Sequence, residues 1–184
     1  MKEARLEEAQ EFWALRKPPP LKITPPDFSY RELPSLDELA GTFRPDLVGG
    51  KAAYLAFFLP AIPPPNRVRG FVIPFAYFRD YLSANTFGDL TLAEVRSLWS
   101  RSHRFQSDPD FRYHQLVQFR EAVEQSGRID TDLIRRIANR TTQLFGSNRI
   151  KLRFRSSSNA EDALLFPAAG LYRSTSVCVA DGLD

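Results

Sequence analysis

The distribution of prolines constrains the fold of this chain more than any other feature of its sequence. Six of the fourteen prolines fall between residues 18 and 34, in the stretch KPPPLKITPPDFSYRELPS. Proline lacks an amide donor and interrupts helices, so this stretch favours an extended connector over packed structure. We therefore predict a boundary near residue 45. An N-terminal helix and Pro-rich linker would occupy residues 1–45, and a folded domain residues 46–184.

Composition limits the class of protein. A hydrophobic content of 43% with fifteen phenylalanines is enough to bury a core, whereas a net charge of +3 is too small to identify nucleic acid as a partner. The single cysteine, Cys178, cannot close an internal disulfide, and acids stand where a signal peptide needs an apolar run. Pro60 interrupts the longest apolar stretch. We expect a cytoplasmic protein without a membrane span.

Apolar residues recur at helical spacing in several segments. Helices are expected over 2–16, after the glycines at 49 and 50, from Pro74 onward, after Thr91, over 112–125 and over 130–145. Glu94 stands three places after Thr91, as in a capping box. Leu98 is among the side chains expected to face inward, Phe78 shares one helix face with Phe75 and Leu82, and Leu116 is one of the apolar residues of the helix over 112–125.

Three short segments read as strands. GFVI at 70–73 and STSVCV at 174–179 are apolar or β-branched, and IKLRF at 150–154 alternates with period two. Ile150, Leu152 and Phe154 should share one face of that strand, opposite the basic side chains. Together with the helices, these strands indicate an α+β domain whose middle third is a helical insertion.

The sequence VGGK at 48–51 is a first candidate for anion binding. Glycine at a helix start lets the backbone approach an anion, the helix end carries partial positive charge, and Lys51 adds a full charge. Gly50 and Lys51 would then contact phosphate. The spacing is not that of a Walker loop, and a Gly-Gly pair before a helix is also a common turn.

The second candidate is IKLRFRSSSNAED at 150–162. Arg155 closes the predicted strand, and an arginine fork matches two phosphate oxygens. Three serines follow it, and Glu161 and Asp162 could orient the arginine, cap the local backbone or approach a metal-bound nucleotide. A solvated strand end with a polar turn is the alternative.

Taken together, DLVGGKAAYL, GFVI and RFRSSSNAED...AAGLY resemble the N-terminal ATP-binding domain of the phosphoenolpyruvate synthase and pyruvate phosphate dikinase family. That family pattern runs VGGK-x-A-x-L, then GFV, then RSS-x-x-x-ED, an A-G pair and a hydroxyl residue. The resemblance covers about residue 46 to the end. It implies a partial ATP-grasp-like nucleotide-binding domain, its N-terminal subdomain, preceded by a Pro-rich extension.

The resemblance also implies roles for individual residues. Lys51 and Arg155 occupy the positions of the family residues that grip the triphosphate of ATP. Gly170 falls where a loop backbone closes over the nucleotide, and Ser174 where a hydroxyl reaches phosphate. Glu161 matches the family acid pair, for which we expect a supporting role. The loop EDALLFPAAGLY is more apolar than the family pattern, which leaves loop closure and specificity open.

Other parts of such a site are expected outside this chain. The resemblance implies that the ligands for Mg²⁺ lie beyond the arginine strand, and that phosphate passes through a histidine on a further C-terminal or separate phosphohistidine domain. The two histidines here, His103 and His114, fall in the helical middle and should be surface residues. No catalytic residue and no metal ligand are therefore assigned in this chain.

Three functions remain to be compared. The first is the ATP-binding portion of an ATP-dependent phosphotransferase, a kinase or dikinase, whose isolated 184 residues are a fragment without activity of their own. The second is a truncated, non-catalytic module that binds a nucleotide or a protein. The third is nucleic-acid binding through NRVRG, RRIANR and NRIKLRFR, but solvated faces explain these segments more simply, so no nucleic-acid partner is expected.

Overall fold

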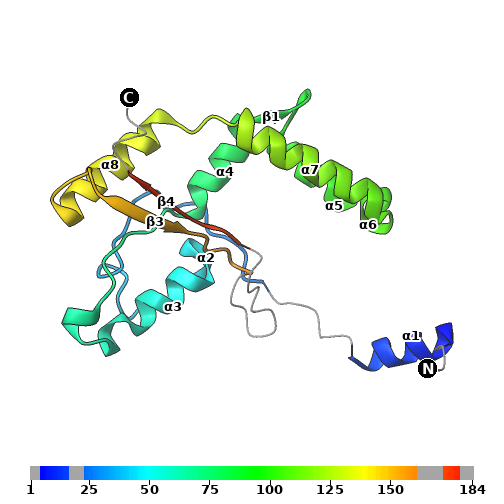
Figure 1. Cartoon of the computed structure of the whole chain (residues 1–184), viewed down its shortest axis with the longest axis horizontal. Coiled ribbons are helices and arrows are strands. Elements are labelled where there is room, and N and C mark those ends of the chain that lie inside the picture. The colour runs from blue at the N-terminus through cyan, green and yellow to red at the C-terminus, as the bar shows by residue number, and fades with distance from the viewer. Residues whose placement is uncertain (1–4, 17–22, 161–171, 179–184) are drawn as a thin grey trace.

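The computed structural model describes residues 5–16, 23–160 and 172–178 of the chain (Figure 1). Its helices and two small antiparallel sheets confirm the α+β class. The helices are α1 (Leu6–Arg16), α2 (Pro45–Val48), α3 (Gly50–Phe58), α4 (Phe75–Ala84), α5 (Leu92–Arg101), α6 (His103–Ser107), α7 (Pro109–Gln125) and α8 (Thr131–Phe145). The strands are β1 (Thr86–Phe87), β2 (Leu90–Thr91), β3 (Lys151–Arg155) and β4 (Ser174–Cys178). Within the described residues, no helix is long and apolar enough to span a membrane.

The main hydrophobic core forms around α2 and α3. Pro45 opens α2, where its missing amide costs no helical hydrogen bond, and Gly49 separates α2 from α3 with a φ of 82°. Small residues on α3 let neighbouring segments approach closely. The buried core residues are Leu36, Leu47, Val48, Ala53, Ala56, Leu59 and Val72.

Residues 23–36, here called the strap, make polar contacts with α2, α4 and α8. Most of the strap forms neither helix nor strand. The expectation that it stays outside packed structure is wrong for its last part, because Leu33 and Leu36 are buried and Ser35 forms a β-bridge with Phe71. Proline removes amide donors but not apolar surface, so a Pro-rich segment can still contribute side chains to a core.

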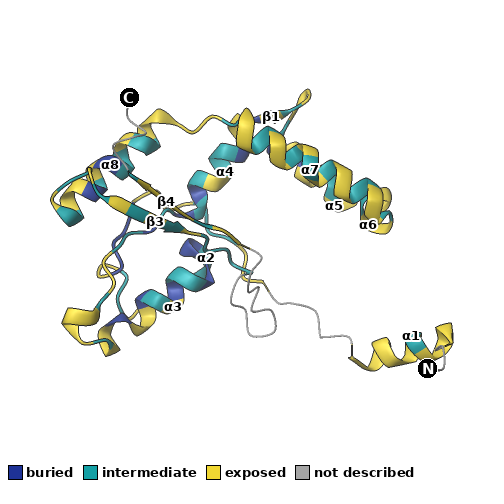
Figure 2. Cartoon of the chain, viewed as in Figure 1, coloured by how far each residue is buried: buried dark blue, intermediate teal, exposed yellow. Residues whose placement is uncertain are grey.

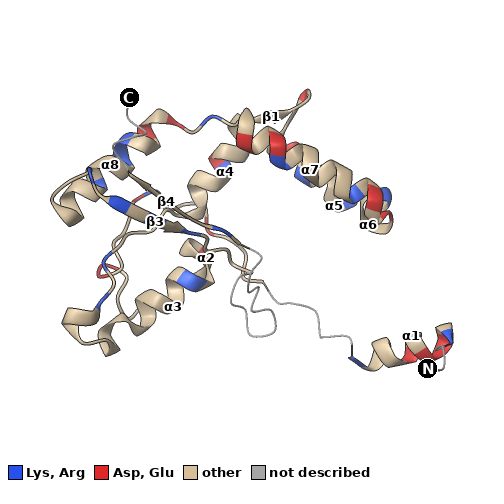
Figure 3. Ribbon diagram, in the orientation of Figure 1, with Lys and Arg blue, Asp and Glu red and all other residues tan. Residues whose placement is uncertain are grey.

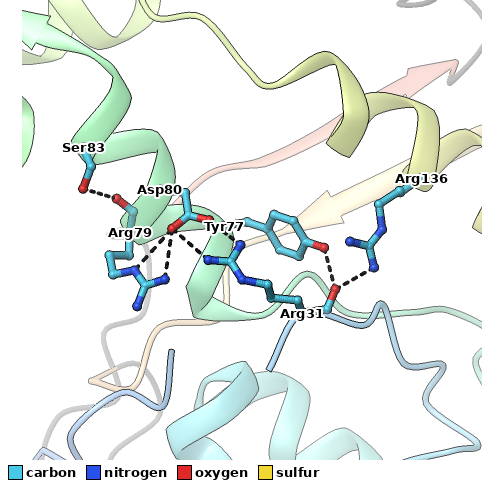
Figure 4. A network of polar contacts seen from close by, with 6 residues as sticks. All are labelled: Arg31, Tyr77, Arg79, Asp80, Ser83 and Arg136. Atoms are coloured by element: carbon cyan, nitrogen blue, oxygen red, sulfur yellow. Dashed lines mark hydrogen bonds and ion pairs between the residues drawn. The ribbon is translucent and has the colours of Figure 1, made fainter. Parts of the chain in front are cut away.

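Arg31 fastens the middle of the strap to two helices (Figure 4). Its guanidinium binds the Asp80 carboxylate of α4 at 2.5 Å, and its carbonyl oxygen accepts bonds from the Tyr77 hydroxyl at 2.5 Å and from Arg136 of α8 at 2.7 Å. The bond from Arg31 holds the pKa of Asp80 below its usual value, while burial raises the pKa of Tyr77. The strap therefore links α4 to α8.

Arg44 fastens the first part of the strap to α2. Its guanidinium lies 3.1 Å from Asp27 and 2.9 Å from Asp46, and the Asp27 amide donates to the Asp46 carbonyl at 2.8 Å. The bond from Arg44 lowers the pKa of Asp46. The Asn159 side chain donates to the Thr24 carbonyl at 2.7 Å, and this bond connects the strap to the turn after β3.

Helices α4 to α7 and the β1–β2 hairpin form an arm that extends from the core (Figure 1). The capping box at Thr91 and Glu94 is confirmed. The inward position predicted for Leu98 is wrong, since this side chain is 49% exposed. Phe78 and Leu116, at apolar helical positions, are 53% and 46% exposed. Exposed residues run along the arm (Figure 2), so within the described part of the chain no second layer covers these faces.

A small aromatic cluster holds the arm together. The Trp99 ring stacks on Phe105 with 4.7 Å between centroids and touches Phe119 at 5.1 Å, while Phe87 of the hairpin lies 6.1 Å from Phe119. These contacts join α5, α6, α7 and β1 without any fully buried residue on α7. The middle third of the chain is helical, as predicted.

Helix α8 and the β3–β4 hairpin complete the domain. Asp130 caps the start of α8, and Gly146 ends it in the left-handed conformation with a φ of 80°. Exposed and half-buried residues alternate along β3, which confirms the period-two prediction, and β3 pairs antiparallel with β4. The strand predicted at 70–73 is reduced to the single bridge at Phe71.

Candidate functional site

The two candidate motifs, far apart in the sequence, are in direct contact. The Gly50 amide donates to the Ser158 carbonyl at 2.9 Å, and the Ala52 amide donates to the Ser157 hydroxyl at 2.9 Å. Ala52 and Ser157 are 105 positions apart. The turn that opens α3 and the turn that follows β3 thus form one structural unit.

Gly49 makes this contact possible. Its φ of 82° and ψ of 165° lie in a region that is almost restricted to glycine. A Cβ atom at this position would lie 2.0 Å from the carbonyl oxygen of Ser157 and 2.3 Å from its carbonyl carbon. Both the backbone conformation and the close approach of the Ser157 turn therefore require glycine.

Ser157 caps α3 from outside the helix. Gly49, the residue before the helix, has no side chain to bind the first amides, and the Ser157 hydroxyl takes that role at Ala52. The sequence placed three serines beside Arg155, but it gave no signal that one of them caps a helix at this separation. Gly50 was expected to offer its amide to an anion, and in this arrangement that amide binds Ser158 instead.

A cavity of about 700 Å³ lies between the start of α3, residues 68–73 and β3. Lys51 and Arg155 both line it, so the structure brings together the two cations that the sequence analysis selected. Ser156 and Ser157 line the same end. The volume is in the ordinary range for small-molecule sites.

The cavity carries strong positive charge. Arg69, Lys151 and Arg153 also line it, which makes five cations with Lys51 and Arg155, and none of the described lining residues has a carboxylate. Basic residues along β3 and on α3 are visible in Figure 3. Like charges gathered around one hollow favour an anionic ligand that neutralises them.

Arg69 shows how one of these cations is positioned. Its guanidinium donates to the Leu144 carbonyl near the end of α8 and lies 5.2 Å from the centroid of the Phe145 ring. Arg153 lies across the hairpin, with its guanidinium 3.4 Å from the Ser176 hydroxyl. Arg69, Lys151 and Arg153 were not predicted to belong to an anion site. Their only signal was that they belong to the basic segments NRVRG and NRIKLRFR.

The rest of the cavity wall is apolar. A hollow lined by both basic and apolar residues suits a ligand with an anionic group and a flat or apolar body. The apolar lining residues are Leu36, Ala52, Leu55, Val68, Phe71, Val72, Ile73, Phe145, Ile150, Leu152 and Phe154.

The remaining predicted site residues divide into two groups. Ser174 opens β4 and is the direct cross-strand partner of Arg155, so both side chains project on the same face of the hairpin. Ser174 is not among the cavity-lining residues. Gly170 and Glu161 lie outside the described residues.

The histidines are exposed, as predicted, and lie on the arm. His103 opens α6, and the Nδ1 of His114 lies 2.8 Å from the Asp110 carbonyl on α7. Neither lines the cavity. Over the part of the chain that the structure describes, no three His, Cys, Asp or Glu side chains gather in a way that could hold a metal ion.

A second cavity, of about 500 Å³, lies between the strap and α8. Its two arginines already bind the protein: Arg136 donates to the Arg31 carbonyl, while Arg140 donates to the Leu33 carbonyl at 2.8 Å and pairs with Glu38. The bond from Arg140 lowers the pKa of Glu38. These groups hold the strap in place, and the first cavity is the better candidate site.

Comparison with known proteins adds no further support. No protein-family model matches the chain, and neither the curated proteins nor the solved structures gave a match. The fold defines an α+β domain with a basic cavity at the junction of two loops. The resemblance to the phosphoenolpyruvate synthase family rests on the sequence motifs alone.

Proposed function

We propose that this chain binds the phosphate groups of ATP through Lys51 and Arg155, as the ATP-binding portion of a phosphotransferase of the phosphoenolpyruvate synthase and pyruvate phosphate dikinase type. One observation carries the proposal. The two cations that the motifs single out, from opposite ends of the domain sequence, line the same cavity.

The electrostatics of the cavity favour a polyanion over a singly charged ligand. Five basic residues line the hollow, and none of the described lining residues has a carboxylate to balance them. ATP with one bound Mg²⁺ keeps a net negative charge that these groups can neutralise. The apolar wall around Leu55 and Phe154 can cover a less polar part of the ligand.

The local structure holds each cation in place. Arg155 ends a strand whose five residues are all paired with β4, and Lys51 stands in the first turn of α3, where the helix end adds partial positive charge. The amides of Gly50 and Ala52 bind Ser158 and Ser157. The charged side chains, and not these two amides, therefore supply the main contacts to phosphate.

ATP supplies the transferable phosphoryl group when it is bound. The residues of this chain would bind and orient the triphosphate and lower the cost of gathering its charges. The acceptor and the residues that select it belong to the parts of such an enzyme that the resemblance places outside this chain.

Calorimetric titration with Mg-ATP tests the proposal. Lys51→Ala and Arg155→Ala should each weaken binding roughly tenfold or more, which is about 1.4 kcal/mol, because each removes a cation from the ligand's phosphates. Arg120→Ala is the matched control, since this arginine of the arm is 68% exposed and lies 4.0 Å from Glu124. Unchanged affinity in both site variants refutes the assignment.

The non-catalytic alternative makes the same prediction for binding. It predicts no phosphoryl transfer, so transfer must be measured in a full-length relative that carries the same two motifs. Binding without transfer in that longer protein would support the non-catalytic module. A salt-sensitive gel shift with nucleic acid would favour the third reading, because counterion release makes such binding strongly salt-dependent.

A further inference from the structure

Four aromatic side chains form an exposed patch on and beside α3, here called the aromatic patch: Phe43, Tyr54, Phe57 and Phe58. Each is between 41% and 54% exposed. Their rings touch in a continuous series, with centroids 4.8 Å apart for Phe43 and Tyr54, and 5.2 Å apart for Phe57 and Phe58. A contiguous exposed apolar patch of this kind is typical of an interaction site.

Helix α1 has the complementary property. None of its residues is buried, and Leu6, Phe12 and Trp13 are 74%, 47% and 67% exposed. Leu6 and Trp13 are seven residues apart and share one face of the helix. An isolated helix of 11 residues is only marginally stable in water, so α1 needs a surface to pack on.

The two surfaces match in size. Because an aromatic side chain can bury roughly 150–250 Å² and about half of each patch residue is exposed, the patch offers roughly 350 Å². Leu6, Phe12 and Trp13 of α1 offer a similar area. One contact between α1 and the patch would remove roughly 700 Å² from water, and two such contacts roughly 1,400 Å², which is within the range of specific protein interfaces.

We propose that α1 of one chain packs on the aromatic patch of a second copy, and that the exchange is reciprocal. In its own chain α1 stands apart from α3 (Figure 1) and leaves the patch exposed. A two-fold dimer makes the same contact twice, and only the doubled area reaches the size of a stable interface. The acidic side chains Glu7, Glu8 and Glu11 lie away from the Trp13 face and stay in solvent.

Sedimentation velocity on the full chain over a range of concentrations tests the exchange. The wild type should form dimers, and Trp13→Glu and Phe58→Glu should each weaken dimerisation roughly tenfold or more, because a charge replaces a central aromatic contact. Trp13 lies outside the hydrophobic core, so its substitution leaves the domain folded. Glu11→Lys is the matched control: Glu11 is exposed and lies roughly 160° around the helix from Trp13 and roughly 100° from Phe12, so dimerisation should be unchanged.

Mixing the two variants distinguishes a dimer formed by reciprocal packing of α1 on the aromatic patch from a dimer formed through other surfaces. A Trp13→Glu chain and a Phe58→Glu chain together retain one intact contact, so the mixture should dimerise more tightly than either variant alone. A wild type that stays monomeric at every concentration overturns the proposal, whether α1 is free or lies on its own chain. A dimer that both variants leave intact, or that mixing does not restore, also overturns it.

Discussion

Substituting Gly49 by alanine tests whether the two motifs form one unit. The new Cβ would meet the Ser157 carbonyl oxygen at 2.0 Å, and its backbone conformation strongly disfavours any residue except glycine. The backbone conformation alone costs roughly 1–3 kcal/mol. Because the nearest atoms are backbone atoms, the Ser157 turn must move away from α3.

That movement breaks two hydrogen bonds. The bonds from Gly50 to Ser158 and from Ala52 to Ser157 are each worth about 1 kcal/mol. Together with the backbone cost, Gly49→Ala should lower the free energy of unfolding by roughly 3–5 kcal/mol. A typical domain has a stability of about 5–15 kcal/mol, so the loss should be plain in a urea titration.

Gly146→Ala is the matched control. Gly146 has a nearly equal φ of 80°, but no heavy atom of the described residues lies within 4 Å of the point that its Cβ would occupy. Its substitution should cost only roughly 1–2 kcal/mol for the left-handed backbone. If the two variants lose equal stability, the close approach of the Ser157 turn to Gly49 does not exist in solution, and the cavity that depends on it loses its support.

Three further predictions concern local contacts. Ser157→Ala removes the cap from the Ala52 amide and should destabilise the domain by about 1 kcal/mol in chemical denaturation; no change would show that the cap is not formed. Arg44 lowers the pKa of Asp46, so the stability from this pair is present above the unfolded pKa of about 3.9 and is lost as pH falls below it. In this acid range, the free energy of unfolding of Asp46→Asn should depend less steeply on pH than that of the wild type. An identical pH dependence in the two proteins would contradict the assignment. Thr91→Ala should cost about 1 kcal/mol by removing the capping box of α5, measurable as a lower melting temperature, and a wild-type melting temperature would show the box to be dispensable.

Local sequence signals predicted the helix ends well. Asp130 and Gly146 at the ends of α8, and Thr91 with Glu94 at the start of α5, act through groups within a few residues of each other. Such short-range chemistry can be read directly from the sequence. The alternation of β3 could be read for the same reason.

Contacts between distant segments could not be predicted from the sequence. The prolines identified the strap as extended but gave no sign that Leu36 enters the core or that Arg31 joins two helices. Apolar spacing predicted which faces of the arm carry Phe78 and Leu98, but not that nothing covers them. Periodicity shows the face of a helix and does not show whether a second layer exists.

The residues of the candidate site likewise include some that the sequence could predict and some that it could not. Lys51 and Arg155 could be selected because their motifs are local, and the structure places both at one cavity. Arg69 and Lys151 could not be selected, because only the fold brings residues 68–73 and β3 to the same hollow.

Hydrogen exchange with increasing Mg-ATP tests the central claim most directly. If Lys51 and Arg155 hold the same ligand, the amides at 50–53 and at 155–158 should both become protected, with one common midpoint. A ligand concentration of about 100 times the dissociation constant should raise the free energy of global unfolding by about 2.7 kcal/mol, and amides that exchange through global unfolding should slow accordingly. Protection of one segment without the other, or no protection of either, would contradict a shared phosphate site.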